Sequence, residues 1–153
     1  MASEPQLEPL YMGYEDVFDH SYERVKDREI DGKRFFGRFY ELFVDASPEI
    51  AQHFKNTDMQ QQLKMMEKSF YSLFIFYATQ NANDYLEKIA HRHSNHDLQI
   101  RVDLFDVWLE NLVKTVREYD PQFNEEVALA WRVVLSPGIT YMKFKFKQHG
   151  KKA

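Results

Sequence analysis

The stretch FYELFVDASPEIAQHF, residues 39–54, carries two helix signals in succession. Its first part extends an apolar face whose members recur at helical spacing, namely Phe35, Phe36, Phe39, Tyr40 and Phe43. Ser47 followed by Pro48 has the pattern of a helix N-cap and a first-turn proline, so a short helix is expected to start there and to end near Phe54. The stretch therefore predicts two consecutive helices, over about residues 31–45 and 48–54.

Apolar residues at the same spacing continue toward both ends of the chain and predict an all-α fold. Further helices are expected over about residues 14–27, 59–80, 84–93, 102–119 and 124–146, the last interrupted near Pro137-Gly138. The longest has cap chemistry at Asn56-Thr57-Asp58 and the apolar stripe Met59, Leu63, Met66, Phe70, Leu73, Phe74 and Tyr77. This gives about six main helices and no strand. One domain is expected over residues 14–148, with an N-terminal arm over 1–13 and a tail over 149–153.

The composition agrees with a single helical domain and excludes several classes of function. Only five Gly and five Pro occur in 153 residues, which suits long helices. The net charge of −4 gives no general attraction to nucleic acid. The chain has no cysteine, and its most apolar run, Phe70 to Ala78, is far shorter than the roughly 20 residues of a membrane span. With no signal peptide at its start, the chain is expected in the cytoplasm.

Two polar residues stand on apolar helix faces and are the first candidates for chemistry. His93 lies four residues after Ile89, and Gln62 lies between Met59 and Met66. A buried polar side chain needs a partner, which is more often structural than functional. From spacing alone, both residues remain compatible with an ordinary helical core.

Three segments resemble bacterial single-domain globins, the haemoglobin-like family. Residues 39–54 resemble the second and third globin helices, with Tyr40, Pro48 and Phe54 at the spacing of that family. The following segment TDMQQQLKMM, residues 57–66, is similar to the start of the distal helix, and YLEKIAHRH, residues 85–93, to the proximal helix. The similarity extends from about Ser21 to the final helix. It implies a globin fold around a pocket for haem b, iron protoporphyrin IX.

The resemblance also implies a role for each pocket residue. His93 would be the proximal ligand of the iron, with its other ring nitrogen donating to an acceptor. Phe54 would pack against the haem face, and Gln62 would take the distal polar position, with Met66 lining the pocket beside it. Tyr40 would face the bound gas. A donor from Tyr40 or Gln62 would favour O2, which gains partial negative charge on ferrous haem, over CO.

The sequence departs from the family pattern at two places near the proximal histidine. Phe105 stands where these globins usually have a tyrosine, and the final helix reads YMKFKF where a glutamate is usual. Without an acidic partner, His93 is expected to be a neutral ligand, which favours gas binding over peroxidase-like chemistry. Glu67 has no explanation in the sequence. His53, His91, His96, Arg92 and Arg101 are each expected to face solvent or a haem propionate.

Three functions remain open at this stage. The first is reversible binding of O2, and also of CO or NO, for oxygen transport or for NO dioxygenation with an external reductase. The second is a haem-based gas sensor that signals through a partner or a homodimer interface made by residues 70–77 with Trp108 and Trp131. The third is a haem-free module of globin shape. The protein is expected to be a monomer or a homodimer.

Overall fold

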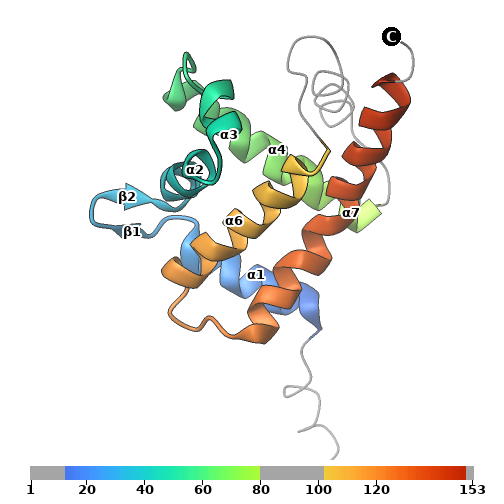
Figure 1. Cartoon of the computed structure of the whole chain (residues 1–153). Coiled ribbons are helices and arrows are strands. Elements are labelled where there is room, and N and C mark those ends of the chain that lie inside the picture. The colour runs from blue at the N-terminus through green and yellow to red at the C-terminus, as the bar shows by residue number, and fades with distance from the viewer. Residues whose placement is uncertain (1–12, 80–101, 151–153) are drawn as a thin grey trace, which may run out of the picture.

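The computed structural model describes residues 13–79 and 102–150, excepting the side chains of residues 146–150, and it confirms the all-α class. Six helices lie in these ranges (Figure 1): α1 (Tyr14–Val25), α2 (Phe35–Asp45), α3 (Pro48–His53), α4 (Met59–Thr79), α6 (Leu104–Tyr119) and α7 (Glu125–Gly150). The helix expected over residues 84–93 lies outside the described residues. None of the described helices is long and apolar enough to cross a membrane.

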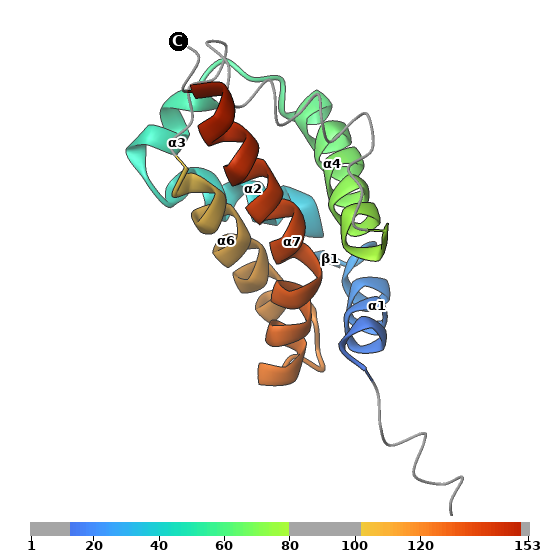
Figure 2. The ribbon, with the colours of Figure 1, turned by 90° about the vertical axis from the view of Figure 1, so that its right-hand side faces the viewer.

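The helices pack around α7, which forms the spine of the domain. Turned by 90°, the molecule shows α7 along its middle, with α6 on one side and α4 above α1 on the other (Figure 2). Pairs of helices pack as α1 with α7, α4 with α7, α6 with α7 and α2 with α6. Their shared core is unusually aromatic, because the ring of Trp131 lies 4.8 Å from that of Phe18 and 5.8 Å from those of Phe35 and Phe70.

The complete burial of Trp131 corrects one expectation. Its side chain is fully enclosed by α1, α2 and α4, so it cannot contribute to a dimer surface of the kind suggested by the sensor hypothesis. Trp108 is half-buried, with its ring 5.7 Å from that of Phe39. The correction concerns Trp131 alone, since Trp108 is partly exposed.

A small hairpin before α2 corrects the expectation that no strand forms. The strands β1 (Glu29–Ile30) and β2 (Lys33–Arg34) pair antiparallel, and α2 begins only at Phe35 instead of near Asp31. The reason is the turn, since Asp31 and Gly32 both have positive φ, 54° and 78°. An Asp-Gly pair in this conformation is typical of a two-residue hairpin. The Tyr119 hydroxyl then holds the hairpin to α6, donating to the Lys33 carbonyl at 2.6 Å.

The expected interruption of the last helix at Pro137-Gly138 is also wrong, because α7 is continuous from Glu125 to Gly150 with Pro137 inside it. Proline removes one backbone donor and does not by itself end a helix that tertiary packing holds. Gly138 has a different role from a helix stop. It is buried at the crossing with α4, where an added Cβ would lie 3.4 Å from the Leu73 Cα and would collide with the Leu73 side chain.

Replacing Gly138 by alanine is therefore expected to destabilise the protein, although alanine is the better helix former. Overpacking against Leu73 should lower the free energy of unfolding by about 1–3 kcal/mol. Gly37 on α2 is the matched control, since its added Cβ would meet nothing within 4 Å. Gly37→Ala should raise the stability by roughly 0.5–1 kcal/mol. Urea denaturation measures both, and a gain for both variants would contradict the close approach of α4 and α7.

A buried polar network joins α1 to the turn between α6 and α7. Asp120 accepts from Ser21 Oγ at 2.6 Å and from Arg24 Nε and Nη2 at 2.7 and 2.9 Å. Trp131 Nε1 donates to Ser21 Oγ at 2.9 Å, and the Gln122 backbone N–H to Asp120 at 2.8 Å. Burial raises the pKa of Asp120, but the bonds from Arg24 and Ser21 outweigh it and hold that pKa below its ordinary value. We call these residues the corner network.

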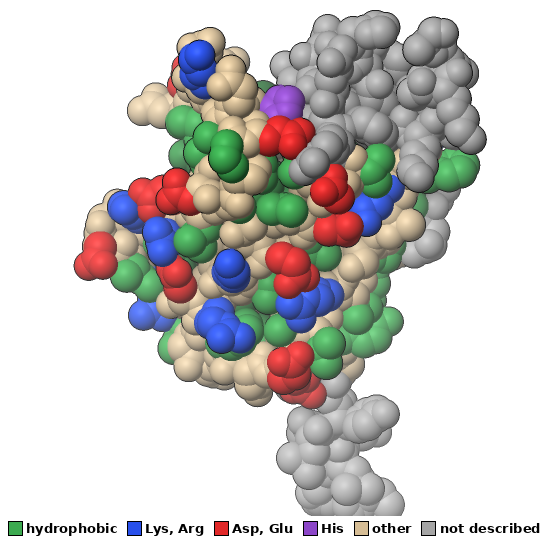
Figure 3. All heavy atoms as spheres, viewed as in Figure 1, with side chains coloured by type: hydrophobic (Ala, Val, Ile, Leu, Met, Phe, Trp, Pro, Cys, Tyr) green, Lys and Arg blue, Asp and Glu red, His purple; other side chains and the backbone are tan. Residues whose placement is uncertain are grey.

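Charged side chains on the face formed by α2, α6 and α7 alternate in sign. Figure 3 shows acidic and basic side chains interspersed over this face. Many are paired, as in Arg38 with Glu118 at 2.8 Å and Arg132 with Glu110 at 2.9 Å. This face therefore offers no continuous basic surface of the kind that nucleic acid binds.

Candidate functional site

Tyr40 and Gln62, which are 22 residues apart in sequence, meet between α2 and α4. Gln62 Nε2 donates to the Tyr40 hydroxyl at 3.0 Å. Tyr40 is buried, with 4% of its surface exposed, and Gln62 is half-buried. The bond uses a lone pair of the hydroxyl oxygen and not its proton, so it is compatible with donation by Tyr40 in another direction. The two residues that the resemblance assigned to the distal side therefore form one unit.

The start of α4 is fixed by a cap that places Gln62 opposite α2. The Asp58 carboxylate accepts from the backbone N–H groups of Gln60 and Gln61 at 3.1 and 3.4 Å, as the cap signal predicted. Gln61, its neighbour in sequence, is exposed on the flank of the helix. Of the polar residues in this turn, Gln62 is therefore the one whose side chain points toward α2.

Phe54 forms the next wall of the site. Ser47 caps α3 by accepting from the Ile50 N–H at 3.2 Å, and Pro48 opens the helix. The helix ends at its C-cap Phe54, whose ring packs edge-on against Tyr40 at 5.6 Å and against Phe43 at 6.0 Å. The three candidates Tyr40, Phe54 and Gln62 are therefore brought together.

Phe43 belongs to the same wall, although the sequence analysis assigned it only to the core. Its ring stacks with that of Phe39, one turn earlier on α2, at 5.4 Å. The sequence does contain a signal for this, because Phe39 and Phe43 are four residues apart and this spacing places both rings on one face of α2. Packing between α2 and α3, which the spacing does not specify, turns Phe43 toward Phe54.

The remaining candidates on α4 and α6 are buried as expected, with one exception. Met66 lies one turn after Gln62 and is 2% exposed, and Phe105 is buried near the start of α6, the helix that packs on α2. Met59 was expected to begin the apolar stripe of α4 but is 37% exposed. It occupies the first turn, which projects beyond the core, so the buried stripe starts after Gln62. Glu67 is exposed, which explains why a charge is tolerated beside Met66.

The proximal candidates fall in the part of the chain that the structure does not describe. His93 lies there, as do His91, His96, Arg92 and Arg101. His53 is described and is exposed at the end of α3. Among the described residues, no cluster of three or more His, Cys, Asp or Glu side chains could hold a metal ion. His93, which the sequence singles out as the iron ligand, stays a prediction.

The described side of the site fits a flat apolar cofactor that carries a small polar ligand. It combines the uncharged rings of Phe43 and Phe54 with two polar groups, the hydroxyl of Tyr40 and the amide of Gln62. Neutral donors in a dry apolar wall stabilise partial negative charge without introducing an ion that would need a counter-charge. This combination suits haem with a diatomic gas ligand.

Comparisons with known proteins agree with this geometry. A family model described as Globin matches residues 33–142 of the chain. Among solved structures, the chain is similar to a protein from Pseudomonas aeruginosa PAO1 whose description calls it structurally highly homologous to a human hemoglobin. The two are 30% identical with a TM-score of 0.77, over 88% of this chain and 98% of that one. No curated protein sequence matches the chain significantly.

Proposed function

The chain belongs to the globin family, a haem-binding family, and from this premise we propose that it reversibly binds a diatomic gas, chiefly O2, at haem b ligated by His93. The observation that supports O2 in particular is the hydrogen bond between Gln62 and Tyr40 against an apolar wall. Iron protoporphyrin IX supplies the site at which O2, CO or NO binds. The protein supplies the axial ligand, the shape of the pocket and the polarity around the gas.

On the distal side, Tyr40 is the donor to the gas and Gln62 positions it. Because Gln62 Nε2 donates to the Tyr40 oxygen, it restricts rotation of the phenol and leaves the proton of the hydroxyl pointing away from the amide. A donor fixed in a water-excluded wall interacts with developing negative charge more strongly than the same donor in water. The pair is therefore expected to retain O2 and to contribute little to CO.

On the proximal side, we propose that His93 is a plain, neutral ligand. Phe105 is buried and carries no group that could donate to or accept from an imidazole. This favours reversible binding over peroxidase-like chemistry. NO dioxygenation is compatible with it, since one O2 and one NO give nitrate when an external reductase restores the electron.

The test is the absorption spectrum of the purified protein with and without dithionite, O2 and CO. The full chain, expressed with ample haem, should show a Soret band that shifts with each gas. The His93→Ala variant should lack this band unless imidazole is added to replace the missing ligand. His53 is an exposed histidine, so the His53→Ala variant should have the same band as wild type. Absence of any Soret band would favour a haem-free module, and an unaltered Soret band in His93→Ala would show that His93 is not the iron ligand. Either result would contradict the proposal.

A further inference from the structure

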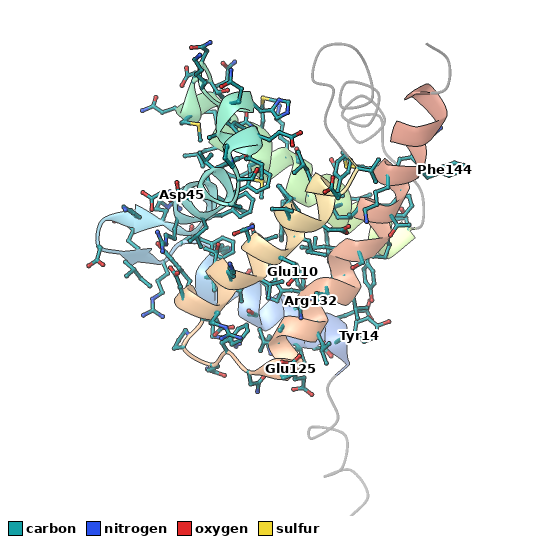
Figure 4. All side chains as sticks on the ribbon, viewed as in Figure 1. Tyr14, Asp45, Glu110, Glu125, Arg132 and Phe144 are labelled. Carbon is teal, nitrogen blue, oxygen red and sulfur yellow. The ribbon has the colours of Figure 1, made fainter. Side chains whose placement is uncertain are left out.

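Trp108 on α6 is the half-buried end of a row of aromatic rings that leads to Tyr40. Its ring packs edge-on against that of Phe39 on α2, with a centroid distance of 5.7 Å and an interplanar angle of 73°. The Phe39 ring lies 5.1 Å from the Tyr40 ring, at 63°. Figure 4 labels Asp45 on α2 and Glu110 on α6, the two helices that this row joins. We call Trp108, Phe39 and Tyr40 the aromatic row.

Phe39, the middle member of the aromatic row, is held in place by its neighbours. Its side chain is fully buried, and its ring also stacks on that of Phe43, one turn later on α2, at 5.4 Å and 14°. In a close-packed interior, the side chains around a lost neighbour relax partly into the space that it leaves. Removing the indole of Trp108 would leave such a space beside Phe39. The position of the Phe39 ring therefore depends on Trp108.

The Tyr40 hydroxyl is sensitive to any shift of its own ring. Gln62 Nε2 donates to it from α4 at 3.0 Å, and the Phe54 ring packs edge-on against the phenol at 5.6 Å and 66°. A hydrogen bond weakens steeply when its distance lengthens or its angle closes. The aromatic row adds a restraint on the phenol that comes from α6. A change at Trp108 should therefore reach the hydroxyl, although Trp108 lies two rings away.

We propose that Trp108 is a positioning residue for O2 binding, which acts through Phe39 and holds the Tyr40 ring where its hydroxyl meets both Gln62 and the bound gas. This inference rests on the proposed role of Tyr40 as the donor to O2. Trp108 acts by filling space, so its indole N–H is not required. Because CO gains little from a distal donor, the aromatic row affects the retention of O2 and leaves that of CO nearly unchanged.

The O2 dissociation rate of the haem-loaded full chain tests this role. Trp108→Ala should raise this rate about three- to tenfold, with a change in the CO dissociation rate of less than about twofold. Trp108→Phe should restore a rate near that of wild type, because a phenyl ring can still pack on Phe39 although it has no N–H. Val116→Ala is the control for lost packing on α6, since Val116 is fully buried about two turns away. It should leave both rates unchanged. In the Tyr40→Phe background, Trp108→Ala should have no further effect.

Nuclear magnetic resonance of the CO-bound protein tests the same contact without O2. The side-chain amide signal of Gln62 should shift in Trp108→Ala in the direction that it takes in Tyr40→Phe, and it should stay at its wild-type position in Trp108→Phe and Val116→Ala.

Three results would overturn the inference. The first is an O2 dissociation rate or a Gln62 signal that Trp108→Ala leaves unaltered although Tyr40→Phe changes it. The second is a Trp108→Phe variant as fast as Trp108→Ala, which would assign the effect to the indole N–H. The third is a shifted Gln62 signal with O2 dissociation unaltered in both Trp108→Ala and Tyr40→Phe. That result would confirm the contact and show that Tyr40 is not the donor, so the proposed function would fail and this inference with it.

Discussion

Replacing Asp120 by alanine is expected to lower the free energy of unfolding by about 3–5 kcal/mol, the cost of breaking a buried ion pair from one side. The Asp120 side chain is fully buried, and the corner network directs Ser21, Arg24 and the Gln122 N–H toward its two oxygens. Without the carboxylate, Arg24 loses its bidentate partner while it remains mostly buried. The Ser21 hydroxyl, which also accepts from Trp131, loses its own acceptor.

Thermal and urea denaturation measure this loss, which should correspond to a fall in Tm of roughly 10 °C for a domain of this size. Asp19→Ala is the control, since Asp19 lies on the same helix α1 as Ser21 but is exposed. Its effect should stay within about 0.5 kcal/mol. Equal effects of the two substitutions would mean that the corner network does not join α1 to the rest of the domain.

Acid should remove the same contribution in a defined direction. The pKa of Asp120 is lowered in the folded protein from an ordinary value of 3.8, so its stabilising effect is present above that value and is lost as the pH falls toward the lowered pKa. Asp120→Asn cannot titrate. The difference in stability between wild type and Asp120→Asn should therefore be constant near neutral pH and shrink below about pH 4.

The helices could be predicted from the sequence because their signals are local. Ser47 with Pro48 and the cap at Asp58 are interactions within a few residues, and each appears where the pattern placed it. The errors lie where distant contacts decide. Asp31-Gly32 was included in a helix, although its turn geometry is better satisfied by the hairpin that Tyr119 holds. Pro137-Gly138 was interpreted as a break, because only the structure shows that Leu73 packs against Gly138.

The site was predictable to a similar extent. The polar position of Gln62 on an apolar face indicated an inward-facing residue, but nothing in its spacing named Tyr40 as the partner, since that contact depends on how α2 and α4 cross. Met59 was assigned to the buried stripe because periodicity does not show where a helix leaves the core. Trp131 was considered for a dimer surface because the helical spacing of a tryptophan is the same in a buried core and at an interface between subunits. Only its burial in the structure distinguishes the two.

Replacing Tyr40 by phenylalanine is expected to increase the O2 dissociation rate about 10- to 100-fold, with a change in the CO dissociation rate of less than about threefold. The reason is that the substitution keeps the ring, which packs on Phe54 and Phe39, and removes only the hydroxyl. A strong hydrogen bond in a dry site is worth about 1.5–3 kcal/mol, and each 1.4 kcal/mol corresponds to a tenfold change in rate. Stopped-flow displacement of O2 by CO measures both rates.

The neighbouring glutamines separate donation from positioning. If Tyr40 donates and Gln62 orients it, Gln62→Leu should increase the O2 dissociation rate only a few-fold, because the phenol remains but loses its 3.0 Å bond to the amide. Gln61→Leu, on the exposed flank of the same turn, should have no effect. The double variant Tyr40→Phe, Gln62→Leu should then be no worse than Tyr40→Phe alone, because a positioning residue has nothing left to position. A larger effect of Gln62→Leu than of Tyr40→Phe would assign the donor to Gln62 and contradict the order proposed here.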